Sequence, residues 1–211
     1  MNSPPFPRPS HNPLRRFCLW ILSIFGWRTV LVPFPGAKGV VVVYPHTSNW
    51  DFVIGMLYRL GHAVPVHWLG KHSLFRWPFA GLLRRIGGIA IDRRTPGGAI
   101  RSIVDEFDRR DFMWLALAPE GTRSYTDHWK SGFYQIAVAA NVPCGLGYID
   151  YPRKILGIDT FVIFSGDMDK DIEKLRAFYA DKRGLRPGQA SEIRLHTPAP
   201  ALTDTETRPT N

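Results

Sequence analysis

A run of four valines between Gly39 and Tyr44 restricts the fold more than any other stretch of this 211-residue chain. A continuous β-branched run is typical of a strand that is buried on both faces, because a strand with one solvated face alternates apolar and polar residues. Strands of that kind belong to parallel sheets that lie between layers of helices. The run therefore predicts an α/β protein.

Strand and helix patterns alternate along most of the chain. The helical spacing of apolar residues predicts helices over residues 49–60, 73–86, 96–107, 131–140 and 167–178. Short apolar runs predict further strands over residues 64–69, 88–91, 112–117, 142–149 and 155–164. This alternation predicts a mostly parallel or mixed central sheet that is flanked by helices.

The charge of the chain indicates the kind of partner. Lysine and arginine number 27 against 18 aspartates and glutamates, which leaves a formal net charge of +9. Such a surplus predicts an anionic partner: nucleic acid, an anionic membrane surface or a phosphorylated substrate. The basic residues are dispersed and no nucleic-acid-binding motif is visible, so we expect no nucleic-acid partner. Cys18 and Cys144 are the only cysteines, which excludes a disulfide framework and an all-cysteine zinc site, and we expect no metal.

An apolar segment near the N-terminus bears on where the protein acts. Nine of the 11 residues from Phe17 to Trp27 are apolar, whereas a spanning helix needs about 20. The segment over residues 14–28 is therefore either a core helix or an interfacial helix, with Arg15 and Arg16 at the level of lipid headgroups. We favour the interfacial helix, because the segment is apolar nearly all round. A peripheral or monotopic protein on the cytoplasmic face of the cell membrane is the expected result, and the two cysteines agree with a reducing compartment.

Composition changes at both ends of the chain. Five prolines lie in the first 13 residues, and proline, threonine and alanine become frequent after about residue 186. We expect a disordered lead-in over residues 1–13, one domain over residues 14–185 and a disordered tail over residues 186–211.

His46 and Asp51 form the first candidate catalytic pair. His46 follows the valine-rich strand, and Asp51 falls in the first turn of the next helix. Proteins of the α/β class bind ligands at the carboxyl ends of strands, and a carboxylate on one imidazole nitrogen makes the other nitrogen a base. The alternative is an ordinary first-turn acid beside a polar loop histidine. Between the pair lie three possible supporting residues, Thr47, Ser48 and Asn49.

Two further loops also follow predicted strands. The loop after residues 112–117 contains Glu120, Gly121, Thr122, Arg123 and Ser124, and Lys130 lies close to it in the sequence. Glycine lets the backbone approach a ligand closely, and the guanidinium of arginine matches phosphate oxygens. The other loop follows residues 88–91 and contains Arg93. The alternative for each loop is a solvated surface turn.

The order of these motifs resembles that of the glycerolipid acyltransferases, a family that includes the 1-acylglycerol-3-phosphate acyltransferases. His-x4-Asp comes first, then Gly-x-Ile-Ala-Ile-Asp-Arg, then Pro-Glu-Gly-Thr-Arg-Ser and finally Val-Pro, between residues 46 and 149. The resemblance implies a glycerol-3-phosphate acyltransferase-like fold. It also implies transfer of a fatty acyl group from acyl-CoA or acyl-carrier protein to the hydroxyl of a lysolipid. His46 would be the general base, Asp51 would orient it, and the thioester is a co-substrate, with no other cofactor.

The resemblance also implies an acceptor site. Arg93 matches the phosphate-binding arginine of the family, and the block from Glu120 to Arg123, with Ser124 beside it, matches the block held to bind the acceptor phosphate. The acceptor favoured is 1-acylglycerol-3-phosphate. The sequence departs from the family at three positions, with Pro45, Ala118 and Gly145 where asparagine, phenylalanine and proline are common. These departures leave another lysolipid, such as a lyso-aminolipid, as an alternative acceptor.

Two other functions compete with acyl transfer. The same base could activate water, which would make the protein a hydrolase of acyl thioesters or lysolipids. A non-catalytic basic membrane-binding protein is the remaining alternative. It does not explain why His46, Asp51, Glu120 and Arg123 all occur together.

Overall fold

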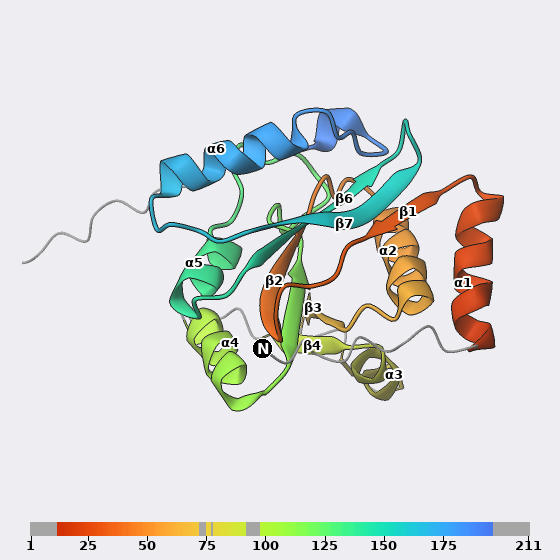
Figure 1. Cartoon of the computed structure of the whole chain (residues 1–211), viewed down its shortest axis with the longest axis horizontal. Helices are drawn as coiled ribbons and strands as arrows, with labels where there is room; N and C mark the ends of the chain where they lie inside the picture. Colours follow the sequence, from red (N-terminus) through yellow and green to blue (C-terminus); the bar gives the residue numbers. More distant parts are fainter. Residues whose placement is uncertain (1–11, 72–74, 77, 92–97, 196–211) are drawn as a thin grey trace, which may run out of the picture.

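The computed structural model describes residues 12–71, 75–76, 78–91 and 98–195 (Figure 1). Within these ranges the chain forms a seven-stranded sheet with the strand order β1-β7-β6-β2-β5-β3-β4. The strands are β1 (Arg28–Leu31), β2 (Lys38–Val43), β3 (Val66–Lys71), β4 (Gly88–Ile91), β5 (Met113–Leu117), β6 (Cys144–Asp150) and β7 (Ile155–Val162). Neighbouring strands are parallel except β6 and β7, which are antiparallel. The predicted mixed α/β sheet is confirmed, and β1 is an edge strand that the sequence patterns did not predict.

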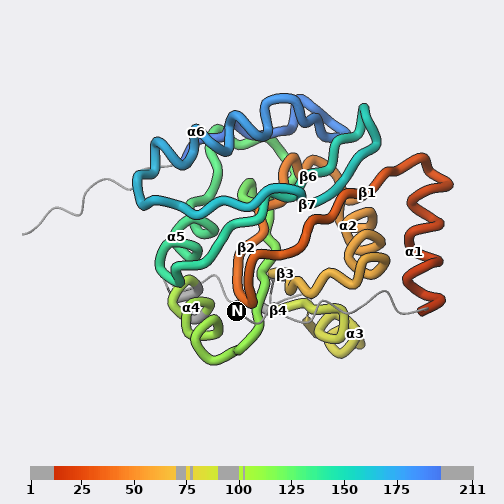
Figure 2. Tube along the Cα trace, viewed as in Figure 1, coloured from red at the N-terminus to blue at the C-terminus, as the bar shows by residue number. Residues whose placement is uncertain are grey.

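Helices cover both faces of this sheet (Figures 1 and 2). The helices are α1 (Pro13–Ile24), α2 (Asn49–His62), α3 (Ala80–Arg85), α4 (Gly98–Arg109), α5 (Gly132–Ala139) and α6 (Met168–Tyr179), followed by a 3₁₀ turn, η2 (Pro187–Gln189). One hydrophobic core lies between the sheet and α4, α5 and α6, and a second lies between the sheet and α1 and α2. Among the described residues, α3 covers only the last part of the helix predicted over 73–86.

The valine run explains how one sheet supports two cores. Val40 and Val42 belong to the core under α4, α5 and α6, whereas Val41 belongs to the core under α1 and α2. All three side chains are fully buried, as the run predicted for a strand covered on both faces. The glycine before them makes room for a neighbour, because a Cβ on Gly39 would lie 2.2 Å from the indole of Trp114 on β5.

The N-terminal helix α1 has one face on the domain and one exposed face. Cys18 and Leu22 are buried against the domain, and α1 runs so close to α2 that a Cβ on Gly61 would lie 2.7 Å from Leu19. The opposite stripe of the helix is apolar and more than half exposed, and it consists of Leu14, Phe17, Trp20 and Ile24. One side of the segment therefore packs in the core, and the other side is an exposed apolar surface. Its expected position at a membrane interface stays a prediction.

The two arginines of α1 have different surroundings. Arg15 donates hydrogen bonds to the carbonyl oxygens of Gly61 (3.4 Å) and His62 (3.1 Å) at the end of α2, whereas Arg16 is exposed. The last carbonyl groups of a helix have no partner within the helix and carry partial negative charge, so a guanidinium stabilises them. Arg15 therefore contacts the end of α2, and its expected position at the level of lipid headgroups stays a prediction. None of the described helices is long and apolar enough to cross a membrane.

The segment after α6 is part of the folded domain as far as residue 195. The hydroxyl of Tyr44 donates to the carbonyl oxygen of Ser191 at 3.0 Å, and the Trp129 amide donates to the carbonyl oxygen of Arg194 at 2.7 Å. The expectation of a disordered tail from residue 186 is therefore wrong for residues 186–195, because their polar backbone groups find partners on the domain. Residues 1–11 and 196–211, where we also expected disorder, lie outside the described residues.

Candidate active site

The candidate base lies where β2 ends. His46 stands three residues after the last residue of β2, and its Nδ1 lies 3.3 Å from the Oδ2 of Asp51 in the first turn of α2. The Asp51 side chain is buried, while the His46 side chain is 19% exposed. With Nδ1 directed at the carboxylate, Nε2 is the nitrogen left to accept a proton. The contact predicted from the His-x4-Asp spacing is present in the structure.

The start of α2 holds Asp51 in place. Ser48 is the N-cap of α2, and its Oγ accepts a hydrogen bond from the Trp50 amide at 3.2 Å. In return, Oδ2 of Asp51 accepts from the Ser48 amide at 2.8 Å, which completes a capping box. Ser48 therefore supports the pair by fixing the helix terminus, whereas Asn49, the first residue of α2, is exposed.

Glu120, in the loop after β5, connects this loop to the loop of His46 and to the segment after α6 that contains Ser191. Its Oε2 accepts from the His46 amide at 2.7 Å, and its Oε1 accepts from the Ser191 amide at 2.9 Å. Burial raises the pKa of Glu120, and the amide groups of Ser191 and His46 act against that rise. Glu120 is only 1% exposed, so its carboxylate holds the backbone of the histidine loop. The expectation that Glu120 contacts the acceptor phosphate is wrong, because both of its oxygens are buried against backbone donors.

The rest of the loop after β5 faces outward. Gly121 has a φ of +64°, and a Cβ there would lie 2.9 Å from the side-chain atoms of Lys130, so glycine serves both the turn and the packing of that lysine. Thr122 accepts from the Ser124 amide through its Oγ1 at 3.3 Å. Arg123, Ser124 and Lys130 are exposed.

The segment after α6 reaches the same edge of the sheet. Thr47 is fully buried, and its Oγ1 accepts from the Arg186 amide at 3.2 Å. With its amide oriented to suit its neighbours, Gln189 donates to the carbonyl oxygens of Arg123 and Thr47, both at 3.0 Å. Thr47 therefore supports the site from below, by joining the histidine loop to residues 184–189.

Arg93, the predicted phosphate-binding arginine of the second loop, lies outside the described residues. Within the described part of the chain, no group of three or more histidine, cysteine, aspartate or glutamate side chains is arranged to hold a metal ion. Both Cys18 and Cys144 are free and buried.

Two residues that the sequence patterns missed complete the site. Tyr151 follows the end of β6, and its hydroxyl donates to Oδ1 of Asp51 at 2.7 Å. Burial and this hydrogen bond raise the pKa of Tyr151, so the phenol stays protonated and acts as the donor. Ser191 lies in the segment that we expected to be disordered. Tyr151 could have been found, because it follows a predicted strand just as His46 and Glu120 do.

Comparison with known proteins agrees with this geometry. Residues 30–152, more than half of the chain, match the protein family described as Acyltransferase. The chain belongs to the acyltransferase family. No curated protein matches the chain. Among solved structures, it is similar to the 1-acyl-sn-glycerophosphate (LPA) acyltransferase PlsC from Thermotoga maritima, with a TM-score of 0.52 and 19% identity over 80% of this chain and 74% of that chain.

Membership of the family shows that the protein is an acyltransferase, which confirms the resemblance drawn from the motifs. The similarity to PlsC, at 19% identity, confirms the fold. The matched range contains His46, Asp51, Glu120 and Tyr151, and these residues follow three strands that are neighbours in the sheet, β6, β2 and β5. Carboxyl ends of neighbouring parallel strands meet at one edge, where α/β proteins bind ligands.

Proposed function

We propose that this acyltransferase moves a fatty acyl group from an acyl thioester to the free hydroxyl of a lysophospholipid, with 1-acylglycerol-3-phosphate as the acceptor. The donor is acyl-CoA or acyl-carrier protein. The single observation that carries the proposal is the contact of 3.3 Å between the His46 ring and the buried, hydrogen-bonded carboxylate of Asp51. The name of the similar PlsC structure refers to the same acceptor.

The reaction needs one base and no covalent enzyme intermediate. Nε2 of His46 removes the proton of the acceptor hydroxyl as its oxygen attacks the thioester carbonyl carbon. The C–S bond then breaks, the new ester forms, and the thiolate takes the proton from the imidazolium. A positioned general base of this kind contributes about 10²–10⁴-fold. Asp51 keeps the ring in the tautomer that leaves Nε2 free, and it stabilises the imidazolium that forms.

Cationic groups beside the base suit an anionic acceptor. Arg123 and Lys130 are exposed on the loop that Glu120 ties to His46. A guanidinium binds phosphate oxygens through two parallel hydrogen bonds, and holding the acceptor beside the base makes the attack effectively intramolecular. We assign the acceptor phosphate to Arg123, supported by Lys130 and Ser124, and to Arg93 of the second loop.

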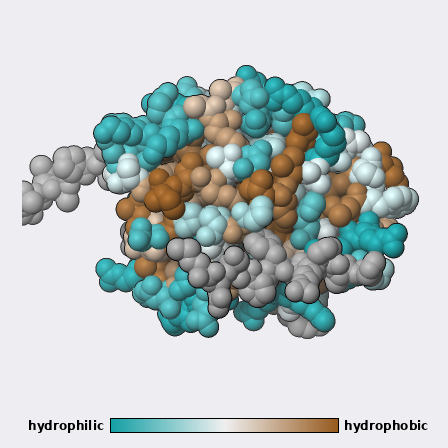
Figure 3. All heavy atoms as spheres, viewed as in Figure 1, coloured by the Kyte–Doolittle hydropathy of each residue, from teal (hydrophilic) through white to brown (hydrophobic). Residues whose placement is uncertain are grey.

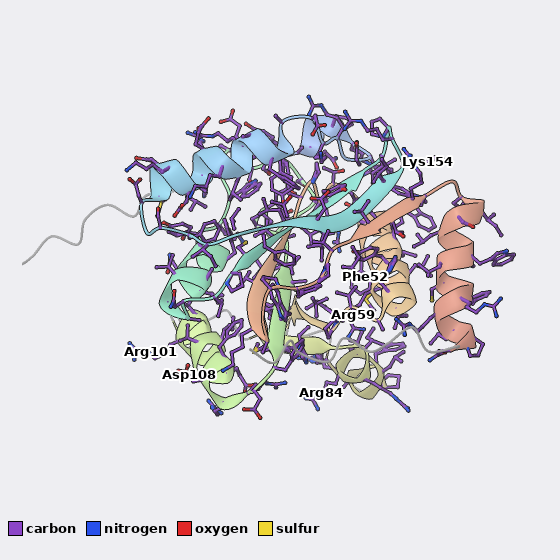
Figure 4. The ribbon with its side chains drawn as sticks, viewed as in Figure 1. Phe52, Arg59, Arg84, Arg101, Asp108 and Lys154 are labelled. Carbon is purple, nitrogen blue, oxygen red and sulfur yellow. The ribbon has the colours of Figure 1, made fainter. Side chains whose placement is uncertain are left out.

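An apolar surface suits a lipid interface. Hydrophobic atoms lie at the edge of the molecule where α1 runs (Figure 3), the helix whose outer stripe is exposed. The first turns of α2, beside Asp51, also expose Trp50, Phe52 and Val53, and Figure 4 labels Phe52 on this helix. Exposed aromatic and aliphatic groups next to basic residues are typical of interfacial helices. We propose that these residues bind the cytoplasmic face of the cell membrane, where the lipid acceptor resides.

An acceptor panel tests the proposal. Purified protein receives one labelled acyl thioester, offered as acyl-CoA or as acyl-carrier protein, with glycerol-3-phosphate, lysophosphatidic acid, other lysophospholipids or lyso-aminolipids. Labelling of lysophosphatidic acid alone is the expected result. Loss of thioester at the same rate without any acceptor would instead show a hydrolase, and labelling of a lyso-aminolipid would reassign the acceptor.

Two variants assign the roles of the residues in the same assay. His46→Ala should lower kcat at least 100-fold, as expected for loss of a general base, while binding to anionic vesicles stays unchanged. Arg123→Ala should raise KM for the phosphorylated acceptor. The matched control is Arg101→Ala, because Arg101 is exposed on α4, which lies on the opposite side of the view from α2 (Figures 1 and 4). Full transfer by His46→Ala would remove His46 from the role of base.

A further inference from the structure

Three contacts connect Trp27, which follows α1, with His46. The ring of Trp27, just after α1, packs edge-on against the ring of Tyr151, with centroids 5.0 Å apart and an interplanar angle of 85°. The Tyr151 hydroxyl donates to Asp51 Oδ1 at 2.7 Å, and Asp51 Oδ2 lies 3.3 Å from His46 Nδ1. The two carboxylate oxygens of Asp51 are thus divided between the tyrosine on one side and the histidine on the other.

We propose that Tyr151 is a positioning residue for acyl transfer, and that Trp27 holds it in place so that the seating of α1 determines the geometry of the base. The inference rests on the proposed function, in which His46 is the base and α1 contacts lipid. In metal sites, groups that hydrogen-bond to a ligating histidine or carboxylate contribute about 10–100-fold to affinity or activity, and the Tyr151 hydroxyl has the same relation to Asp51. In this role Tyr151 acts through Asp51, to which its hydroxyl donates.

The hydrogen bonds of Asp51 show why Tyr151 matters. A carboxylate that accepts only from the Ser48 amide can rotate about its terminal torsion, which is broad for aspartate. The Tyr151 hydroxyl occupies Oδ1 and therefore fixes the plane of the carboxylate. Oδ2 is then directed at both the Ser48 amide, at 2.8 Å, and Nδ1 of His46. Without the phenol, the carboxylate keeps its helix-capping role and loses the defined orientation that the imidazole needs.

The position of Tyr151 depends in turn on the junction between α1 and β1. Trp27 is buried, and its amide donates to the Leu22 carbonyl oxygen of α1 at 2.8 Å. The same junction is bonded to the turn that carries Tyr151, because Lys154 Nζ donates to the Phe25 carbonyl oxygen at 2.9 Å. Figure 4 shows Lys154 at the end of the β6–β7 hairpin, beside the chain that leads from α1 into β1. A shift of α1 therefore reaches Tyr151 through packed side chains.

The test is the variant Tyr151→Phe, which keeps the ring against Trp27 and removes only the hydroxyl. We expect kcat to fall about 10-fold with little change in KM, by analogy with loss of an orienting partner. The acidic limb of the pH profile should move to lower pH, because a carboxylate that is no longer held toward Nδ1 stabilises the imidazolium less. A merely structural role would not move the pH profile.

Tyr148→Phe is the matched control. Tyr148 lies on the same strand, β6, and donates to Asp159 at 2.8 Å, so this variant removes a comparable tyrosine–aspartate bond away from the dyad. Unchanged kcat and pH profile in Tyr151→Phe, or an equal fall of kcat in Tyr148→Phe, would overturn the inference. If His46→Ala retains full transfer, the proposed function fails. If His46→Ala is inactive and Tyr151→Phe is normal, only this inference fails.

Trp27 is tested with Trp27→Leu and, in case that variant does not fold, with Trp27→Phe. Turnover is measured with acceptor in anionic vesicles and with a short-chain acceptor free in solution. Trp27→Leu should lower kcat with the acceptor in vesicles, although Tyr151 keeps its hydroxyl. Trp27→Phe should restore part of that kcat, because it returns an aromatic edge to the ring of Tyr151. Wild-type turnover in both Trp27 variants would refute the connection to α1.

Discussion

Replacing Glu120 with glutamine keeps the shape of the side chain and removes one of its two acceptors. In the wild type, the two carboxylate oxygens accept from the His46 amide at 2.7 Å and from the Ser191 amide at 2.9 Å. Both partners are donors. The amide nitrogen of glutamine must therefore face one of them, and that buried N–H group is left without an acceptor.

The size of the effect follows from these two bonds. A buried donor left unsatisfied costs about 1–3 kcal/mol, and the remaining bond weakens by about 1 kcal/mol when its acceptor loses its charge. Relief of burying a charge offsets part of this loss, since burial raises the pKa of Glu120. The free energy of unfolding should fall by about 2 kcal/mol, which corresponds to a decrease in Tm of about 4–8 °C for a chain of this size.

Urea unfolding followed by tryptophan fluorescence and by circular dichroism measures this change. Hydrogen exchange at the Ser191 amide should accelerate in the same variant, because that donor loses its charged acceptor. Glu173→Gln is the control, since Glu173 on α6 is 70% exposed and pairs only with Arg176 among the contacts seen, and we expect it to change stability by less than about 0.5 kcal/mol. Equal urea midpoints for the two variants would refute the bracing role of Glu120.

Two further predictions concern stability. Gly121→Ala should lower the free energy of unfolding by about 1–2 kcal/mol, because φ at Gly121 is +64° and a Cβ there would meet Lys130. The control Gly188→Ala should leave Tm unchanged, because a Cβ at Gly188 would meet nothing within 4 Å. Equal Tm values for the two variants would contradict this prediction. Burial lowers the pKa of His62 and of His67 below the ordinary 6.5. The unfolded chain then binds more protons than the folded one, so stability should fall as the pH decreases below about 6.5, by up to about 1.4 kcal/mol per pH unit for each histidine. Urea titrations between about pH 5 and pH 8 check this, since His62→Gln should flatten the curve and an unaltered slope would contradict the assignment.

Local patterns in the sequence were enough to find the candidate catalytic pair, His46 and Asp51. The valine run identified β2, and the polar residues after it were recognised as the start of a helix. A strand end followed by an N-cap and a first-turn acid places His46 and Asp51 near each other through few intervening residues. Their contact therefore depends on short-range geometry, which residue spacing encodes.

Local patterns did not predict the structural partners of His46 and Asp51. Glu120 was singled out as a substrate-binding residue, and its location under the His46 backbone appears only when β5 lies beside β2. Ser191 was assigned to a disordered tail, because its surroundings are rich in proline, threonine and alanine. Its hydrogen bonds come from residues far away in the chain, and no local pattern reports such bonds.

By itself, the sequence determined the alternating α/β architecture, the acyltransferase motifs and the residues that stand at strand ends. Periodicity, capping and turn chemistry act over a few residues, so they are readable in order along the chain. Only the tertiary structure decided that β6, β2 and β5 are neighbours, and hence that Tyr151 and Glu120 join the pair formed by His46 and Asp51. Strand order depends on long-range pairing and on the burial of both sheet faces together, which no single segment specifies.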